Sequence, residues 1–245
     1  MSLFGLHLLF GALVVLLVFP LCRLGVRRRM KQIWSRWLLA ALGVRVVITR
    51  QLPAGSLLLV ANHVSWLDIY LINSLCPVAF VSKADVKNWP LIGWLARHND
   101  TIFLQRGSRG HAHVINQEIA GVLSQGCPVT VFPEGTTTEG DRVLHFHGAL
   151  LQPALSVGAQ LVPLALRYAE ASHPEQPSPI AAYAGDTTLG QSLWGIAGCN
   201  ALVANLSVLS PLEGNDRKVL AVEARAAIAD HLGLTLDVPV TSVAG

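Results

Sequence analysis

One short stretch constrains the fold of this chain more than any other. Leu57–Val60 is a run of leucine and valine, which is typical of a buried strand. Asn62 and His63 follow it almost at once. Catalytic groups in α/β folds often lie where a strand ends and the next element begins. The stretch therefore predicts an α/β domain with His63 at the end of a buried strand.

His63 has an acidic residue, Asp68, five positions after it. Histidine is the usual general base near neutral pH because its unperturbed pKa is about 6.5, and a carboxylate beside it can fix its tautomer. A regular helix turns through about 500° over five residues, so the two side chains would not share a helical face. The pair is a catalytic site only if the backbone turns between the two residues; otherwise it is a chance spacing.

Three further blocks carry a pattern: F-L-Q-R-G over 103–107, V-F-P-E-G-T over 131–136 and L-V-P-L over 161–164. With N-H-x4-D over 62–68, they resemble the glycerolipid (lysophospholipid) acyltransferase family, of the 1-acyl-sn-glycerol-3-phosphate acyltransferase type. The order and spacing of the blocks match over Asn62–Pro163. N-H-x4-D is a weak signal alone, but F-P-E-G-T after it makes the resemblance specific.

The resemblance implies an acyl transfer. His63 would take the proton from an acceptor hydroxyl, and Asp68 would hold His63 in the right tautomer. The hydroxyl would then attack the thioester of acyl-CoA or acyl-carrier protein, which is a co-substrate, and no cofactor is implied. The implied acceptor is the sn-2 hydroxyl of 1-acyl-sn-glycerol 3-phosphate (lysophosphatidic acid), giving phosphatidic acid in phospholipid synthesis. The chain has no G-x-S-x-G, G-x-G-x-x-G or P-loop pattern, which argues against the commonest hydrolases, dehydrogenases and NTPases.

Substrate-binding residues are implied in two of the other blocks. Arg106 follows a predicted strand, Thr101–Leu104, in a turn rich in glycine and arginine that suits an anion. By itself this turn is as readily a solvated loop, but the resemblance implies that Arg106 binds the phosphate of the acceptor. Phe103 belongs to the same block. The resemblance also implies that the block of Pro163 lines the donor or acyl site.

The F-P-E-G-T block supplies three more candidates. Glu134 could hydrogen-bond a hydroxyl of the acceptor or orient Arg106, although without the resemblance it would be read as a solvated turn residue. Gly135 lets backbone N–H groups approach a ligand closely, and Thr136 adds a donor. The resemblance implies acceptor binding for Glu134 and Gly135.

Departures from the family pattern leave the acceptor open. Thr137 and Thr138 stand where many members have Arg and Ser, and Asp100 stands where a small residue is common. F-P-E-G-T-T-T also resembles the bacterial branch that acylates lyso-ornithine lipid, which lacks phosphate, and glycerol 3-phosphate is another option. A non-catalytic membrane lipid-binding module is the alternative from another class. The presence of both His63 and Asp68 argues against it.

The N-terminal segment predicts a membrane anchor. Leu3–Cys22 carries no Asp, Glu, Lys or Arg, and a helix of that length spans about 30 Å, the thickness of a bilayer's hydrocarbon core. The positive charges follow this stretch, so we read it as an uncleaved anchor and not as a signal peptide. The basic flank predicts a single anchor in the inner (cytoplasmic) membrane with the catalytic domain in the cytoplasm. Met30–Leu42 is either an interfacial helix or a helix packed on the domain.

The composition agrees with membrane association. Hydrophobic residues make up 52% of the 245 residues and charged residues 13%, against a typical charged share of about 25%. The net charge of +3 is no nucleic-acid signature, but it suits an anionic membrane surface. The four scattered cysteines indicate reduced, mostly buried thiols. His145 and His147, even with Asp141, lack a recognised metal-site spacing, so no metal is predicted.

The expected architecture is an α/β fold, with a mixed, mostly parallel sheet flanked by helices over 44–245 and the N-terminal membrane-anchoring helix over 1–43. Proline within a strand points to an edge or a bulge, which is the expectation for Pro163. Asn88–Ala96 is read as a core helix or as a lipid-facing, acyl-lining element. The predicted strands are Val44–Thr49, Leu57–Val60, Val78–Val81, Thr101–Leu104, Pro128–Phe132, Gln160–Leu166 and Ala201–Leu209, and the remaining predicted helices are Ser65–Leu75, His111–Ser124, Gly148–Val157 and Arg217–Leu232.

Overall fold

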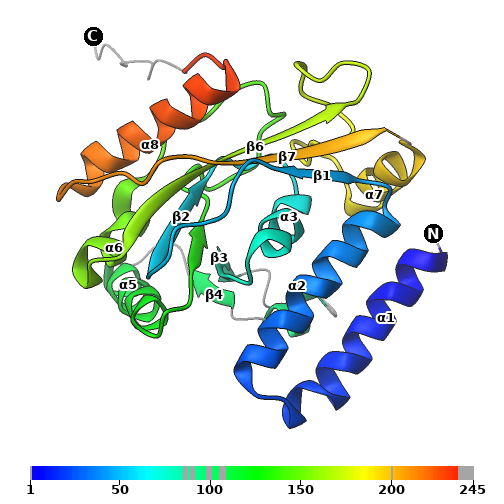
Figure 1. The fold of residues 1–245 in the computed structure, drawn as a ribbon, viewed down its shortest axis with the longest axis horizontal. Coiled ribbons are helices and arrows are strands. Elements are labelled where there is room, and N and C mark those ends of the chain that lie inside the picture. Colours follow the sequence, from blue (N-terminus) through cyan, green and yellow to red (C-terminus); the bar gives the residue numbers. More distant parts are fainter. Residues whose placement is uncertain are drawn as a thin grey trace.

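A computed structural model describes residues 2–84, 88, 92–97, 101–104, 109–199 and 201–236 of the chain. Its centre is a seven-stranded sheet in the order β1-β7-β6-β2-β5-β3-β4, with helices on both faces (Figure 1). The seven predicted strands are all present. Their observed bounds are β1 Arg45–Ile48, β2 Leu57–Ala61, β3 Ala79–Lys83, β4 Thr101–Leu104, β5 Val129–Val131, β6 Gln160–Glu170 and β7 Leu202–Val208.

The sheet is mixed and mostly parallel, as predicted. Every neighbouring pair is parallel except β6 and β7, so β1 and β7 run opposite to the other five strands. Parallel strands bring their carboxyl ends to one edge of a sheet. The segments that follow β2, β5, β3 and β4 therefore start on the same side of the molecule.

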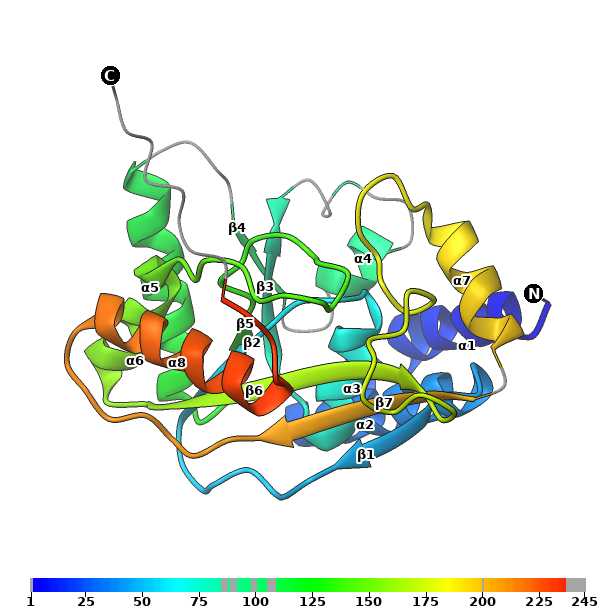
Figure 2. The same ribbon diagram turned by 90° about the horizontal axis from the view of Figure 1, so that it is seen from above.

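Helices cover each face of the sheet and create two cores. Leu57 and Leu59 of β2 pack with the core under α2, α3 and α7, whereas Leu58 and Val60 pack with the core under α5, α6 and α8. Figure 2 shows these two groups of helices on opposite sides of the sheet. The helices are α1 Ser2–Leu17, α2 Leu24–Ala41, α3 Leu67–Leu75, α4 Ile92–Arg97, α5 Arg109–Ser124, α6 Gln152–Val157, α7 Leu189–Gly198 and α8 Arg217–Leu232, with short 3-10 helices at η1 Phe19–Leu21 and η3 Gly148–Leu151.

The N-terminal segment forms a helical hairpin. α1 and α2 lie side by side and antiparallel (Figure 1), with η1 between them. The expectation of one helix over Leu3–Cys22 is wrong, because α1 ends at Leu17 and Pro20 lies in η1. Proline has no N–H for the helical ladder and clashes with the preceding turn. Within the described residues, no helix has both the length and the apolar character needed to cross a membrane.

Polar side chains of α2 fasten the hairpin to α3. The Lys31 ammonium donates to the carbonyl of Val78 at 2.8 Å, and the Arg36 guanidinium donates to the carbonyl of Ser74 at 2.8 Å. Gln32 donates to the carbonyl of Leu75 at 2.7 Å. The bonds of Arg36 and Gln32 satisfy carbonyls at the C-terminus of α3, where positive charge is also favourable, and the bond of Lys31 reaches the segment between α3 and β3. The structure shows this helix packed on the domain.

Proline explains two other differences from the expected elements. The helix expected over Gly148–Val157 is divided into η3 and α6, and Pro153 lies in the first turn of α6, where its missing N–H costs no bond. Pro163 lies in β6, between β2 and β7, so of the two expected positions the edge is wrong. The bulge is present, because the three steps from Leu161 to Leu164 face four from Leu212 to Val208. The strand tolerates it because pairing with β7 begins only at Leu164.

Two helices were misplaced or missed. The helix expected over Asn88–Ala96 is the shorter α4, Ile92–Arg97, and residues 89–91 lie outside the described part. α7 was not predicted. The start of α7 has a sequence signal, because Thr188 and Gln191 form a capping box. In this motif each side chain accepts the backbone N–H of the other residue.

Candidate active site

The segment after β2 is fixed to the neighbouring strand before it turns. The side-chain amide of Asn62 donates to the carbonyl of Leu166 at 3.0 Å, and its oxygen accepts the N–H of Leu166 at 2.8 Å. The buried asparagine thus continues the ladder between β2 and β6 by one more rung. His63 leaves the sheet from this fixed point.

His63 and Asp68 meet, because the backbone turns between them. The Nδ1 atom of His63 lies 2.7 Å from Oδ2 of Asp68, which is in the first turn of α3. The same oxygen accepts the backbone N–H of Val64 at 2.8 Å and of Ser65 at 3.1 Å. These two bonds close the turn around the carboxylate. The condition that the spacing of five imposes is therefore met.

A residue that the sequence did not single out completes this cluster. The hydroxyl of Tyr168, on β6, donates to Oδ1 of Asp68 at 2.7 Å, and both side chains are buried. Burial and the adjacent Asp68 charge raise the pKa of Tyr168 well above its usual 10, so the phenol stays a donor. The signal was present, because Leu164, Leu166 and Tyr168 alternate along one face of the strand, but the predicted strand stopped at Leu166.

The ring of His63 is held on one side and open on the other. It stacks on Phe132, with ring centroids 4.0 Å apart and planes inclined by 16°, and its side chain is 21% exposed. Within the part of the chain that the structure describes, Nε2 makes no hydrogen bond. An imidazole held at Nδ1 by a carboxylate, with Nε2 open to solvent, can take a proton from an incoming hydroxyl.

Glu134 holds the backbone of the same histidine. Its Oε1 accepts the N–H of His63 at 2.7 Å and its Oε2 accepts the N–H of Leu144 at 2.9 Å. The side chain is buried, and burial raises its pKa to about 7 despite the two backbone bonds. Both carboxylate oxygens therefore face the protein backbone. The expected partnership with Arg106 lies outside the described residues.

The rest of the F-P-E-G-T-T-T loop is held by hydrogen bonds within the loop, to His63 and to Tyr183. Gly135 adopts a φ of 70° and donates its N–H to Phe132 at 3.1 Å, a conformation that favours glycine. The N–H of Thr138 donates to the carbonyl of His63 at 2.9 Å, and the hydroxyl of Thr137 donates to the carbonyl of Tyr183. Thr136, in contrast, is exposed.

The remaining predicted site residues do not join this cluster. Arg106 lies outside the described residues. Phe103 is on the edge strand β4, which β3 and β5 separate from β2. Pro163 is buried on β6 opposite Val60. His145 and His147 are exposed rings with centroids 5.2 Å apart, and the described residues contain no group of three side chains able to hold a metal ion.

Comparisons with known proteins agree with the order of the motifs. The family model described as Acyltransferase matches residues 43–167. The lyso-ornithine lipid O-acyltransferase of Pseudomonas aeruginosa is 39% identical over 83% of this chain and 78% of its own length. The 1-acyl-sn-glycerol-3-phosphate acyltransferase of Neisseria meningitidis is 34% identical over 82% of each chain.

The fold has a solved counterpart as well. The crystal structure of PlsC from Thermotoga maritima, a 1-acyl-sn-glycerophosphate (LPA) acyltransferase, superposes with a TM-score of 0.66. The superposition covers 95% of this chain and 94% of that one at 20% identity. At this identity the likeness concerns the fold alone. Together with the family match and the close relatives, it leads to one conclusion: this chain belongs to the acyltransferase family that acts on lysophosphatidic acid and related lysolipids.

Proposed function

We propose that this protein transfers a fatty acyl group from acyl-CoA or acyl-carrier protein to the free hydroxyl of a lysolipid, with His63 as the general base. One observation carries the proposal. The His63 ring is held at Nδ1 by a buried carboxylate, 2.7 Å away, while its other nitrogen faces the outside. This arrangement orients a base without occupying the nitrogen that must receive the proton.

The chemistry needs no covalent enzyme intermediate. Nε2 of His63 takes the proton of the acceptor hydroxyl as its oxygen attacks the thioester carbonyl carbon. Asp68 stabilises the imidazolium that forms. The tetrahedral intermediate then expels the thiolate, and the proton on Nε2 passes to the thiolate sulfur. The new ester bond replaces the broken thioester bond, and the acyl donor is consumed as a co-substrate, so we propose no cofactor.

We propose lyso-ornithine lipid as the preferred acceptor and lysophosphatidic acid as the second candidate. The relative from Pseudomonas aeruginosa supports the first acceptor, as does Thr137. Its hydroxyl bonds the backbone of Tyr183 at a position where many family members have an arginine able to bind phosphate. Arg106 and the relative from Neisseria meningitidis support the second acceptor, because an arginine binds phosphate through two parallel hydrogen bonds.

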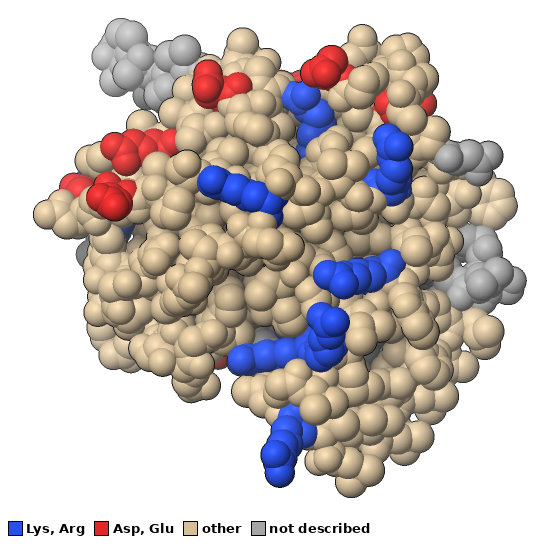
Figure 3. Space-filling view, viewed as in Figure 1, with Lys and Arg blue, Asp and Glu red and all other residues tan. Residues whose placement is uncertain are grey.

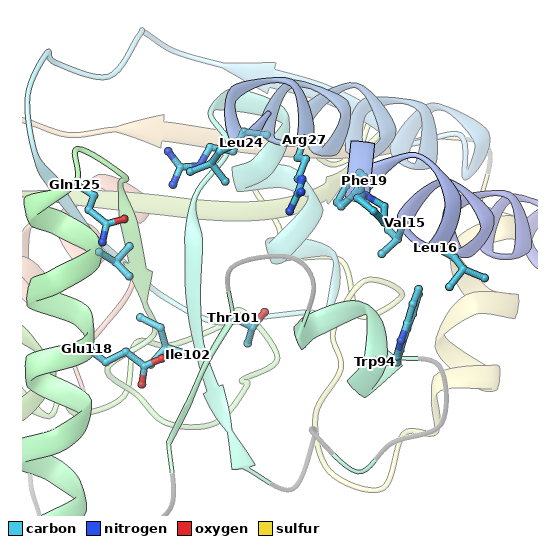
Figure 4. A pocket seen from close by; sticks show the side chains of 13 residues that line it. Val15, Leu16, Phe19, Leu24, Arg27, Trp94, Thr101, Ile102, Glu118 and Gln125 are labelled. Atoms are coloured by element: carbon cyan, nitrogen blue, oxygen red, sulfur yellow. The ribbon is translucent and has the colours of Figure 1, made fainter. Parts of the chain in front are cut away.

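A cavity of about 530 Å³ supports an acyl-chain site. It lies between the turn of the hairpin, α4, β4 and α5, and Figure 4 shows Val15, Phe19 and Trp94 on one of its sides. His63, Asp68 and Glu134 do not line it. A row of aromatic rings leads toward it, since Phe132 stacks on His63 and Phe80 stacks on Phe132 at 6.2 Å. Thr101 of the cavity wall pairs with Phe80 across β3 and β4.

We also propose that residues 1–43 anchor the protein at the inner membrane, with the catalytic domain in the cytoplasm. The first 67 residues contain eight Lys and Arg and no Asp or Glu. Figure 3 shows the basic side chains in a band over α2 and β1, a charge distribution that suits anionic lipid headgroups. α1 adds large apolar side chains that are exposed to solvent in the isolated chain: Leu6, Leu9, Phe10, Leu13, Leu16 and Leu17.

The anchor has a direct test. A chain lacking residues 1–42 should no longer sediment with anionic phospholipid vesicles, whereas the full chain should. A truncated chain that remains fully bound would contradict the proposal that this hairpin is the anchor.

Acyl transfer tests the reaction and the acceptor together. Purified protein in vesicles is given labelled acyl-CoA or acyl-carrier protein with lyso-ornithine lipid, lysophosphatidic acid or glycerol 3-phosphate, and a His63→Ala variant runs alongside. We expect lyso-ornithine lipid to be acylated fastest and the variant to lose at least the roughly hundredfold contribution of a general base. If no acceptor reacts with either donor, the enzyme proposal fails and the chain is a lipid-binding module.

An Arg106→Ala variant separates the acceptors. If the enzyme binds a phosphate through Arg106, the KM for lysophosphatidic acid should rise at least tenfold, because a charged hydrogen bond is worth about 1.5–3 kcal/mol. The KM for lyso-ornithine lipid should stay within about twofold. An equal rise for both acceptors would mean that Arg106 does not recognise the phosphate.

A further inference from the structure

The carboxylate of Asp68 has two oxygens with different tasks. Oδ2 accepts from the imidazole of His63 and the backbone of the turn, whereas Oδ1, within the described part of the chain, accepts only the hydroxyl of Tyr168. Asp68 is 0% exposed and Tyr168 is 1% exposed. A buried carboxylate oxygen without a hydrogen-bond donor lowers the stability of the fold. The hydroxyl of Tyr168 therefore determines the orientation of the Asp68 side chain.

We propose that Tyr168 is a positioning residue for the proton transfer, holding Asp68 with Oδ2 aimed at Nδ1 of His63. The inference rests on the proposed roles of His63 and Asp68. The hydroxyl fixes the rotation of the carboxylate, because it bonds Oδ1, the oxygen to which His63, Val64 and Ser65 do not donate. It also draws negative charge toward Oδ1, which moderates how strongly Oδ2 stabilises a protonated ring.

A plain structural tyrosine would give a different result. In that case the hydroxyl only finds a hydrogen-bond acceptor in Asp68. Its removal then lowers the stability of the protein without changing the pH at which His63 titrates. If the hydroxyl positions Asp68, its removal acts on His63 through two routes with the same sign. More charge on Oδ2 favours the imidazolium, and a carboxylate with one donor fewer takes up a proton at higher pH. Either route moves the loss of the base to higher pH.

Glu134 is a further charged group that faces the pair. It bonds the backbone N–H of His63 and acts on His63 and Asp68 through its charge. Among the described residues, no Lys or Arg side chain pairs with His63, Asp68 or Glu134. The variants must therefore be compared over a pH range in which Glu134 titrates equally in all of them. They also need a control substitution that does not change the hydrogen bonds of Glu134.

The chain offers a matched control in Tyr70. This residue lies on α3, two positions after Asp68, and its ring packs edge-on against Trp34 and Trp66 without bonding Asp68. Tyr70→Phe and Tyr168→Phe delete the same atom from partly and fully buried tyrosines near the same helix. Only Tyr168→Phe removes a donor from the carboxylate.

Full-length protein in detergent is compared as wild type, Tyr168→Phe and Tyr70→Phe. For Tyr168→Phe we expect kcat about tenfold lower, the worth of one hydrogen bond to a charged group. KM should stay within about twofold for donor and acceptor, and the low-pH limb of kcat/KM should move up by about half a pH unit or more. Tyr70→Phe should leave kcat and this limb unchanged. An unchanged pH limb in Tyr168→Phe overturns the proposal.

A second measurement separates this inference from the proposed function. The ring titration of His63 is followed by NMR in histidine-labelled protein and is assigned with a His63→Gln variant. We expect the midpoint to rise in Tyr168→Phe and to stay in Tyr70→Phe, whichever acceptor the enzyme uses. An unchanged midpoint overturns the proposal even in a protein whose substrate is still unidentified.

A shape-preserving variant covers the case in which Tyr168→Phe does not fold. 3-Fluorotyrosine placed at position 168 keeps the ring and makes the hydroxyl a stronger donor. The His63 midpoint should then move in the opposite direction, to lower pH. A shift of the same sign as in Tyr168→Phe, or no shift, contradicts the positioning role.

Discussion

The turn after β2 and the loop after β5 each contain one buried acid, and the two acids hold opposite ends of His63. Asp68, in the first turn of α3, holds the ring and receives four donors, from His63, Val64, Ser65 and Tyr168. Glu134, in the loop after the neighbouring strand β5, holds the backbone N–H of His63 and receives two donors. Of the two acids, only Asp68 bonds the imidazole ring, at Nδ1, while Nε2 of the same ring receives the proton in the proposed reaction.

The two acids also differ in the number of donors that they accept. A buried carboxylate is stabilised in its charged form by each N–H or O–H that it accepts. Two backbone donors do not offset the burial of Glu134, whose pKa rises to about 7. Asp68, in contrast, is held by its four donors in an orientation that directs Oδ2 at the ring of His63. Glu134 is a structural link between the loop after β5 and the turn after β2, and its raised pKa of about 7 brings it close to gaining a proton at neutral pH.

The largest expected effect comes from Asp68→Asn. The amide keeps the shape but carries no charge, and it presents an NH₂ group to donors or to Nδ1 of His63, which favours the wrong tautomer. We expect kcat to fall about a thousandfold with little change in KM. Steady-state kinetics at saturating donor and acceptor measure this.

A control for Asp68→Asn uses Asn62, the buried side chain that precedes His63 and makes two hydrogen bonds with the backbone of Leu166. Asn62→Asp places a charge beside the same histidine but leaves Asp68 in place. It should lower stability more than it lowers kcat per folded molecule. If Asp68→Asn retains more than about a tenth of the activity, Asp68 is not the orienting partner that the comparison requires.

The next effect is on stability and depends on pH. The pKa of Glu134 is raised from 4.5 to about 7 in the folded chain, so the folded state binds this proton more tightly than the unfolded state. The stability that this provides is complete below pH 4.5 and is lost as the pH rises through about 7, by about 3 kcal/mol in total. Urea unfolding from pH 5 to 8 should show a decline that Glu134→Gln abolishes.

Glu134→Gln also separates two interpretations of this residue. If Glu134 positions the backbone of His63, kcat should fall about tenfold, because glutamine can accept only one of the two N–H bonds well. If it binds the acceptor, as the family resemblance implies, KM for the lysolipid should rise with kcat nearly unchanged. Kinetics at saturating acyl donor decide, and Gln160→Glu, remote from the site on β6, controls for a charge change.

Local patterns predicted the frame of this site well. The strands before both acids could be predicted because short runs of leucine and valine bounded by Gly or Pro leave few alternatives. The pairing of His63 with Asp68 could be stated only as a condition on the backbone turn, which the N–H groups of Val64 and Ser65 satisfy. The helix predicted over Leu3–Cys22 is longer than the observed α1, because Pro20 lies in η1 and cannot continue a helix.

Long-range partners could not be predicted from local patterns. Tyr168 meets Asp68 across 100 positions of sequence, and only the strand order brings β6 beside β2. Glu134 was expected to face a substrate, yet its oxygens bond the backbone of His63 and Leu144. Motifs name the residue types at a site, but which atom each one bonds depends on how separate strands are paired.

The smallest expected effect concerns the loop of Glu134 and the choice of acceptor. Thr137→Arg removes the hydroxyl bond to Tyr183 and places a cation where many family members have one. The ratio of kcat/KM for lysophosphatidic acid to that for lyso-ornithine lipid should rise about threefold, as expected for one partly exposed ion pair. Thr136→Arg adds the same charge at an exposed neighbour without breaking that bond. If both variants change the ratio equally, the change comes from the general electrostatic attraction between an added cation and the phosphate of lysophosphatidic acid. If only Thr137→Arg does, the loop after β5 selects the headgroup at that position, while the turn after β2 serves the chemistry common to both acceptors.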